Sequence, residues 1–145
     1  MPLDVQDLLR MPSKELDELF GASPPGELPD GDADGTVLAL TGTKLAGVKA
    51  RFARWLAWRG KVFDRERGDL LNKVGPFGLK AVRAKVYKDE SWLDGKEAII
   101  LDYSKTSVVA QWIRDEIREV APRLYLGLVF WEKSKILHFS LKFPA

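Results

Sequence analysis

Four side chains that can act as an acid or a base lie in or beside apolar segments of the chain: Asp102, Tyr103, Glu116 and His138. A carboxyl group, a phenol or an imidazole can exchange a proton with a bound molecule when burial shifts its pKa. Isomerases and cyclases of apolar substrates can work with one acid and one base in a dry pocket. These four residues are therefore candidate catalytic groups, provided that at least two of them line one cavity.

His138 is the single histidine, and its position allows two interpretations. It lies in an alternating segment whose opposite face carries the apolar residues Leu137, Phe139, Leu141 and Phe143. If that apolar face fills the core, His138 lies on the surface or has a structural role, which we favour. If the other face lines the interior, His138 could be a general base or a haem ligand.

Asp102 and Tyr103 follow an apolar run at residues 98–101, and neighbouring residues of a strand point to opposite sides. One of the two must therefore share the side of the apolar residues, where it could orient a carbonyl group or transfer a proton. The alternative is a strand end in solvent, with Asp102 bound to a nearby arginine. Glu116 borders the apolar stripe of a predicted helix, near Trp112, and is either a pocket carboxylate or an exposed helical charge.

The composition argues against several classes of protein. A length of 145 residues suits one domain, and 23 basic against 21 acidic residues are too balanced for an obligate nucleic-acid-binding protein. With no cysteine and one histidine, we expect neither a metal site nor another cofactor. No apolar run approaches 18 residues, and the N-terminus lacks the basic start of a signal peptide. We therefore expect a cytoplasmic protein without a transmembrane segment.

Hydrophobic periodicity predicts an α+β chain that consists mostly of strands. Strands are predicted at residues 36–40, 61–63, 70–74, 79–87, 98–103, 124–131 and 136–143. Helices are predicted at 43–57 and 107–120, after a short N-terminal helical segment and a loop at 21–35 that is rich in Pro, Gly and Asp.

Sequential, alternating strands usually form an antiparallel sheet. The predicted fold is therefore a curled, mostly antiparallel β-barrel of six to seven strands with two packed helices. Residues 1–35 would form the N-terminal helical segment and loop, and residues 36–145 a single barrel domain.

The stretch "WLAWRGKVF" at residues 55–63 carries a resemblance to a known family. Trp58-Arg59-Gly60-Lys61, followed by an apolar strand, resembles the W-x-G-K ending of the GxWxG signature in calycin-type barrels such as lipocalins. The segments "RAKVYKDESWLDGKEAIILDYSKT" and "RLYLGLVFWEKSKILHFSLKF" resemble the later strands of small bacterial proteins with that signature. The resemblance covers residues 55–143 and departs from the signature at Leu56, where its first glycine belongs. It implies a barrel with an interior cavity, closed at one end by Trp58.

The leading functional hypothesis is a small soluble protein that holds a hydrophobic molecule, such as a fatty acid, a terpenoid or a polyketide, in the barrel. Alternating strands, five Trp and seven Phe favour it, because ligand pockets are mostly apolar with few polar groups. The candidate ligand-binding residues are Trp58, Trp112, Tyr103 and Phe139.

The sequence also allows two alternatives. An isomerase or cyclase could act on an apolar substrate in the same cavity, so the sequence leaves open whether the protein is an enzyme. Basic residues of the helix predicted at 43–57, together with Arg59, could instead bind an anionic membrane or a partner protein. No specific nucleic-acid partner is expected, and a homodimer stays open.

Overall fold

The protein forms a closed barrel in which each strand pairs with the next in antiparallel orientation and β1 pairs with β8. The structure is a computed structural model that describes residues 2–40, 58–75, 78–108 and 110–145. The strands are β1 (Gly31–Leu40), β2 (Trp58–Asp64), β3 (Asp69–Val74), β4 (Leu79–Glu90), β5 (Glu97–Asp102), β6 (Ile113–Ala121), β7 (Leu124–Trp131) and β8 (Ser134–Lys142).

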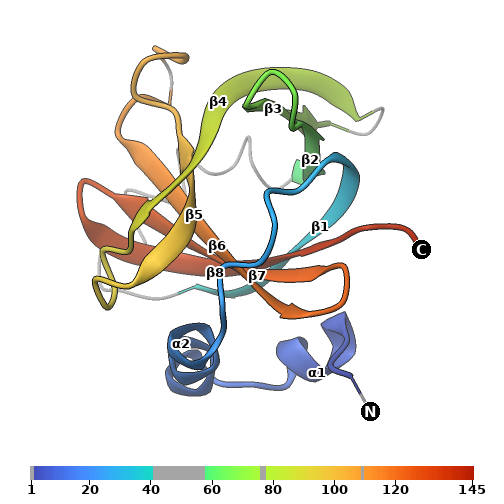
Figure 1. Cartoon of the computed structure of the whole chain (residues 1–145), viewed down its shortest axis with the longest axis vertical. Helices are drawn as coiled ribbons and strands as arrows, with labels where there is room; N and C mark the ends of the chain where they lie inside the picture. The colour runs from blue at the N-terminus through green and yellow to red at the C-terminus, as the bar shows by residue number, and fades with distance from the viewer. Residues whose placement is uncertain (1, 41–57, 76–77, 109) are drawn as a thin grey trace.

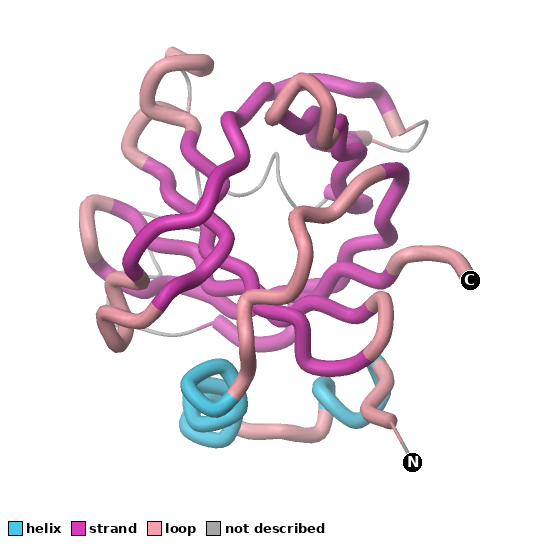
Figure 2. Tube along the Cα trace, in the orientation of Figure 1, coloured by secondary structure: helices cyan, strands magenta, loops and turns pink. Residues whose placement is uncertain are grey.

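Two short helices, α1 (Val5–Leu9) and α2 (Ser13–Ala22), precede the barrel and lie together on one side of it (Figures 1 and 2). They form the N-terminal helical segment that the sequence predicts. Of the helices in the described ranges, neither is long and apolar enough to cross a membrane.

The prediction of an antiparallel barrel is confirmed, but the predicted count of six to seven strands is wrong because the barrel has eight. The additional strand is β6, which occupies most of the segment predicted as a helix at residues 107–120. Ile113 and Ile117 belong to the barrel core, and Asp115 between them forms an ion pair with the buried Lys61. Because the inward position between the two isoleucines is charged, the segment lacks the regular alternation of apolar and polar residues that indicates a strand. The isoleucines are four residues apart, which is also the spacing of residues on one face of a helix. The other predicted helix, at 43–57, lies outside the described residues.

Strand β1 begins at Gly31, so residues 31–35 belong to the sheet rather than to the predicted loop. Two glycines explain why this segment can lie so close to β2. A Cβ atom at Gly35 would overlap the ring of Trp58, and a Cβ atom at Gly60 would overlap the carbonyl oxygen of Ala33. Gly60 also has a φ of 138°, which residues with a side chain rarely adopt. The close approach of β1 and β2 therefore depends on glycine.

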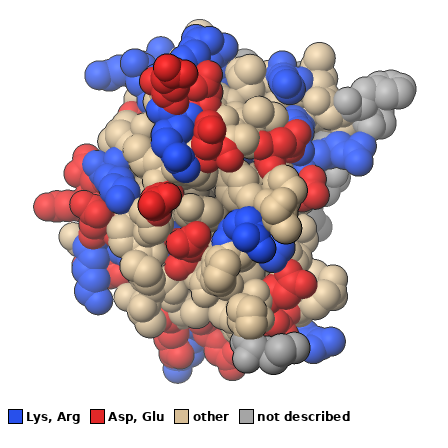
Figure 3. All heavy atoms as spheres, turned by 45° about the vertical axis from the view of Figure 1, so that its right-hand side comes forward, with Lys and Arg blue, Asp and Glu red and all other residues tan. Residues whose placement is uncertain are grey.

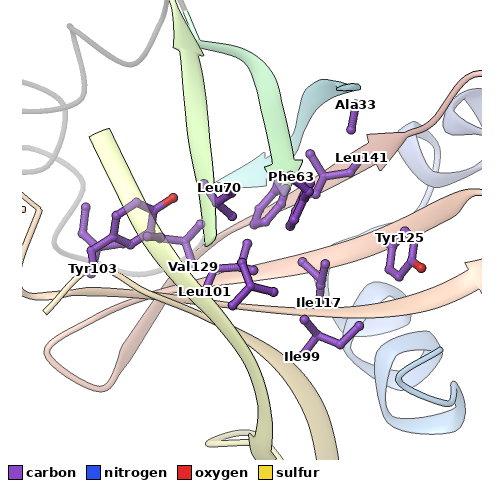
Figure 4. Close-up of a cluster of buried hydrophobic side chains, with 14 of the residues drawn as sticks. Ala33, Phe63, Leu70, Ile99, Leu101, Tyr103, Ile117, Tyr125, Val129 and Leu141 are labelled. Carbon is purple, nitrogen blue, oxygen red and sulfur yellow. The ribbon is translucent and has the colours of Figure 1, made fainter. Parts of the chain in front are cut away.

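The barrel has apolar clusters on both sides of its wall. The interior cluster includes residues from all eight strands, and Figure 4 shows part of it, with Leu101, Ile117 and Val129 among its members. A second cluster lies between the outer face of the barrel and the helices, where Leu16 and Phe20 of α2 are fully buried.

The two alternating segments near the C-terminus contribute to different clusters. In β8, Leu137, Phe139 and Leu141 belong to the interior cluster. In β7, four residues belong to the outer cluster beneath the helices: Leu124, Leu126, Leu128 and Phe130. Both sets are buried, as the sequence predicts. Because the helices cover the outer face of β7, the wall of the barrel is apolar on both sides at this strand, whereas the outer face of β8 carries the buried polar residues His138 and Ser140.

Candidate functional site

A lysine lies inside the barrel. Lys61 of β2 is only 2% exposed, and its ammonium group meets three oxygen atoms. Its Nζ lies 2.7 Å from Asn72 Oδ1, 2.7 Å from the hydroxyl of Tyr103 and 3.1 Å from Asp115 Oδ2. An ammonium group has three protons and no acceptor, so three oxygens satisfy it completely. Lys61, Asn72, Tyr103 and Asp115 are called the interior polar cluster below.

Strand pairing brings the four residues together from two sides of the barrel. Lys61 of β2 lies directly opposite Asn72 of β3 in the antiparallel register. Asp115 of β6 lies opposite Leu101 of β5, and Tyr103 follows two residues after Leu101 on the same face. Since β4 separates the two strand pairs, their side chains meet across the interior rather than along the wall.

Asn72 is held by the backbone as well as by side chains. Its Nδ2 donates to the hydroxyl of Tyr103 and to the carbonyl oxygen of Val82, both at 2.9 Å. Val82 is the residue that the β3–β4 register skips between Ala81 and Arg83, and it has a φ of 56°. A positive φ is an outlier for a β-branched residue, and β-bulges often serve to aim groups next to functional sites. The bulge thus turns a carbonyl group toward Asn72 at the expense of local strain.

Aromatic rings surround the ammonium group of Lys61. The ring centroids of Trp58, Tyr103 and Phe139 lie 5.4, 5.4 and 5.5 Å from Nζ. Trp58 is half-buried, meets Phe139 edge to face at 5.5 Å and donates from Nε1 to Asn72 Oδ1 at 3.0 Å. Three of the four residues predicted to bind a ligand, Trp58, Tyr103 and Phe139, therefore lie together at the interior polar cluster. The fourth, Trp112, precedes β6 and is 49% exposed.

Burial acts on every titratable group of the cluster. It lowers the pKa of Lys61, against the opposing effect of the nearby Asp115 carboxylate. It raises the pKa of Asp115, against the opposing effect of Lys61. It also raises the pKa of Tyr103 well above its usual value, so that Tyr103 is a neutral phenol. The pKa values of Lys61 and Asp115 thus move toward each other, which is the direction that favours proton transfer between them.

The four predicted catalytic residues do not converge on one place. Tyr103 is buried in the interior polar cluster. Its neighbour Asp102 points to the other side, where it accepts hydrogen bonds from the hydroxyl groups of Tyr87 at 2.8 Å and Ser104 at 2.6 Å. Tyr103 is therefore the member of the adjacent pair that faces the apolar interior.

Glu116 and His138 are fully buried, but outside the barrel wall. Glu116 accepts hydrogen bonds from the hydroxyl of Ser91 at 2.5 Å and from the backbone N–H of Trp92 at 2.7 Å. Its carboxylate therefore holds the β4–β5 turn rather than lying exposed on a helix. His138 Nε2 lies 2.7 Å from Asp17 Oδ1, beneath α2, on the opposite side of β8 from Phe139. The interpretation of His138 as structural agrees with this position, although it is not at the surface.

Three members of the cluster were missed by sequence reasoning: Lys61, Asn72 and Asp115. Each is a single polar residue at an inward position of a strand that is otherwise apolar on that face, such as Leu70 and Asn72 in β3. That pattern is the one signal that could have found them, but it requires knowing which face of each strand points inward. In the described ranges no three His, Asp or Glu side chains are grouped as metal ligands.

The outer surface carries charges of both signs. In Figure 3 Lys and Arg side chains are interspersed with Asp and Glu over the face shown. Arg59, at the start of β2, is exposed. The other basic residues considered for membrane or partner binding, Lys44, Lys49, Arg51 and Arg54, lie outside the described residues.

The barrel has a counterpart among solved structures. The crystal structure of a protein from Thermomonospora curvata superposes with a TM-score of 0.62 and 22% sequence identity, over 93% of this chain and 89% of that chain. No protein-family model matches the chain, and no curated protein matches it. At this level of identity, the likeness shows a shared barrel fold alone.

Proposed function

We propose that the protein binds a small, largely apolar molecule inside the barrel and that a polar group of this molecule meets the interior polar cluster. The observation that carries the proposal is the burial of Lys61, Asn72, Tyr103 and Asp115 within an otherwise apolar interior. Burying an ion pair is unfavourable for folding unless its interactions are excellent. A few polar groups among apolar and aromatic side chains is also the usual composition of small-molecule sites.

The strained backbone at Val82 supports the same proposal. A residue held at an unfavourable φ costs about 1–3 kcal/mol, and such residues are concentrated at ligand and active sites. Here the strain serves to orient Asn72, whose two amide protons and carbonyl oxygen all point into the cluster or toward Val82. The resemblance to calycin-type barrels stays a prediction, and it favours the same kind of function. Fatty acids, terpenoids and polyketides remain the candidate hydrophobic ligands.

A binding assay with a neutral apolar dye tests the proposal. We expect N-phenyl-1-naphthylamine to gain fluorescence on binding and native mass spectrometry to detect a co-purified small molecule or the added dye. The variant Val129→Phe narrows the interior, because Val129 points inward and is 7% exposed, and should weaken dye binding about tenfold. The same change at Val37, which is 45% exposed on β1, is the control and should have no effect. A protein that binds no dye and carries no extractable molecule would contradict the proposal.

A second candidate function is proton transfer on an apolar substrate, as in an isomerase or cyclase. It is favoured by the opposite pKa shifts of Lys61 and Asp115 next to the phenol of Tyr103. In this role Asp115 would remove a proton and Tyr103 would donate a hydrogen bond to the developing oxyanion.

Hydrogen exchange on a model ketone tests this second candidate. The protein should accelerate the exchange of the α-hydrogens of 2-tetralone with D2O, followed by NMR. Asp115→Asn should abolish the acceleration, whereas Trp112→Phe, on the exposed surface, should leave it unchanged. Exchange no faster than in buffer would reject the catalytic candidate and leave the binding proposal intact.

A further inference from the structure

We propose that the molecule held at the interior polar cluster is uncharged and presents a hydrogen-bond donor, a hydroxyl or N–H group, to Asp115 Oδ1. The inference rests on the proposed binding function and names its ligand class. It also implies that the cluster discriminates against carboxylates such as fatty-acid anions, although a buried lysine by itself would favour them.

The hydrogen bonds of Lys61 and Asn72 are fully used within the protein. With Lys61 as an ammonium group, its three protons meet three acceptors. Asn72 Oδ1 accepts from Lys61 Nζ and from Trp58 Nε1, while its Nδ2 donates to the hydroxyl of Tyr103 and to the carbonyl of Val82. An amide has two donor protons and an oxygen with two lone pairs, so Asn72 has no capacity left for a ligand. If the side-chain amide of Asn72 were turned by 180°, its NH2 group would face the donor protons of Lys61 and Trp58, and these hydrogen bonds would be lost.

The hydrogen-bonding capacity of Tyr103 is also fully used, so one polar atom of the interior polar cluster is left without a partner in the described ranges. The hydroxyl of Tyr103 accepts from Lys61 and Asn72 and donates to Asp115 Oδ2 at 3.3 Å. Asp115 Oδ2 therefore accepts from both Lys61 and Tyr103. Asp115 Oδ1 is buried and has no hydrogen-bond partner among the described residues. A buried carboxylate oxygen without a hydrogen-bond donor is strongly unfavourable. The one position in the cluster where a ligand can form a hydrogen bond is therefore an acceptor, and the ligand has to supply the donor.

The charge of the cluster leads to the same ligand class. Lys61 and Asp115 form an ion pair at 3.1 Å, so their charges compensate each other. A ligand carboxylate would bring a second negative charge toward Asp115, where no proton of Lys61 remains to neutralise it. Like charges at such short range repel, and burial strengthens the repulsion. A neutral alcohol, phenol or amide avoids this repulsion and supplies the missing proton.

Three molecules with the same apolar tail distinguish the ligand classes: 1-decanol, decyl methyl ether and decanoate. Each competes with N-phenyl-1-naphthylamine for the wild-type protein at pH 8. We expect decanol to bind about 10- to 100-fold more tightly than the ether, which has an oxygen but no donor, because a hydrogen bond to a charged group is worth that factor. Decanoate should also bind more weakly than decanol.

The alternative outcomes separate this inference from the proposed function. Equal affinities for all three, tighter binding of the ether or of decanoate, or dye binding that none of the three displaces would overturn the donor inference while the barrel remains a binding site. A protein that binds neither the dye nor any decyl compound would instead contradict the proposed function.

The variant Asp115→Asn provides a second test. It removes the negative charge that repels a carboxylate, and a bound carboxylate can then replace Asp115 as the counter-charge of the Lys61 ammonium group, so decanoate should now bind more tightly than decanol. Asp89→Asn makes the same chemical change on the exposed surface of β4 and should keep the wild-type order of affinities. An unchanged order in a folded Asp115→Asn variant, with its fold checked by circular dichroism, would overturn the inference. If that variant does not fold, the wild-type series decides.

Discussion

Buried polar residues occur in two regions of this protein, inside the barrel and on its outer face, and their connections differ. The outer network comprises the buried residues Arg118, Glu116, Ser91 and His138 and two half-buried partners, Asp94 and Asp17. Its Arg118 donates to Asp94 and to the carbonyl oxygen of Phe20, which joins both the β4–β5 turn and α2 to β6. Each link of the outer network thus attaches a peripheral segment to the barrel.

The interior polar cluster attaches nothing of this kind. Lys61, Asn72 and Asp115 belong to strands that the backbone hydrogen bonds of the closed barrel already join. Tyr103 follows directly after β5. An apolar set of side chains could fill the same space without a penalty for buried charge. The comparison indicates that the outer network serves the architecture, and it supports our proposal that the interior polar cluster is retained to bind a ligand.

The largest expected effect comes from removing one charge of the interior pair. Lys61→Met should lower the free energy of unfolding by about 3–5 kcal/mol, because it leaves Asp115 buried without its counter-charge. The double variant Lys61→Met/Asp115→Leu should recover this loss, and replacement of a buried ion pair by apolar residues can even add about 1–4 kcal/mol. Urea unfolding followed by circular dichroism measures both. A double variant as unstable as the single one would show that the interior polar cluster is architectural after all.

The equivalent experiment on the outer network should give the opposite pattern. Arg118→Met should cost a similar amount, about 3–5 kcal/mol, since Arg118 is 1% exposed and pairs with Asp94. Adding Asp94→Leu should not restore stability. Arg118 also donates to three backbone carbonyl oxygens, of Phe20, Lys96 and Glu97, which stay unpaired in the double variant. Recovery in this double variant would remove the distinction between the two regions.

The same distinction explains how far the sequence could predict the fold. Strands with regular alternation, such as β8, were predicted within a few residues because one face is apolar and the other is polar or mixed. The prediction failed at β6, whose inward face carries Asp115 between two isoleucines and whose outward face carries the buried Glu116 and Arg118. Hydrophobic periodicity assumes that buried positions are apolar, and β6 has buried charges on both faces.

The candidate site was harder to predict than the fold because it depends on the register between distant strands. Tyr103 was proposed from its position after an apolar run, and it does lie in the interior. Its partner Lys61 is 42 residues away in sequence, and the two meet because of the closure of the barrel. The bulge at Val82 that orients Asn72 leaves no mark in the composition. Placing these residues requires the strand pairing itself.

A pH titration probes the outer network at His138. Burial lowers the pKa of His138 from its usual 6.5, although Asp17 acts to raise it and Lys135 acts to lower it further. The unfolded chain therefore binds a proton more readily than the folded protein does. Stability should be fully present above pH 6.5 and decrease as the pH falls through the folded pKa, by about 1.4 kcal/mol for each unit of the shift.

The variant His138→Gln tests the assignment, because it should flatten the stability profile between pH 8 and pH 5 when unfolding is measured in urea. Trp112→Phe, which changes no titratable group, is the control and should keep the slope of the wild type. A wild-type protein that becomes more stable on acidification in this range would contradict the lowered pKa of His138.

The smallest effects concern two tryptophans that were both predicted to bind a ligand. Trp58→Phe keeps an aromatic ring against Phe139 but removes the Nε1 proton that Asn72 Oδ1 accepts at 3.0 Å. The loss of one hydrogen bond at a partly buried site should lower the free energy of unfolding by about 1 kcal/mol. The same substitution at Trp112, which is 49% exposed, should change it by less than about 0.5 kcal/mol. Because Trp58 contacts the interior polar cluster, its substitution should also weaken dye binding, while Trp112→Phe should not. Equal responses of the two variants in both measurements would mean that Trp58 behaves like an exposed residue. Its hydrogen bond to Asn72 would then contribute nothing to the interior polar cluster.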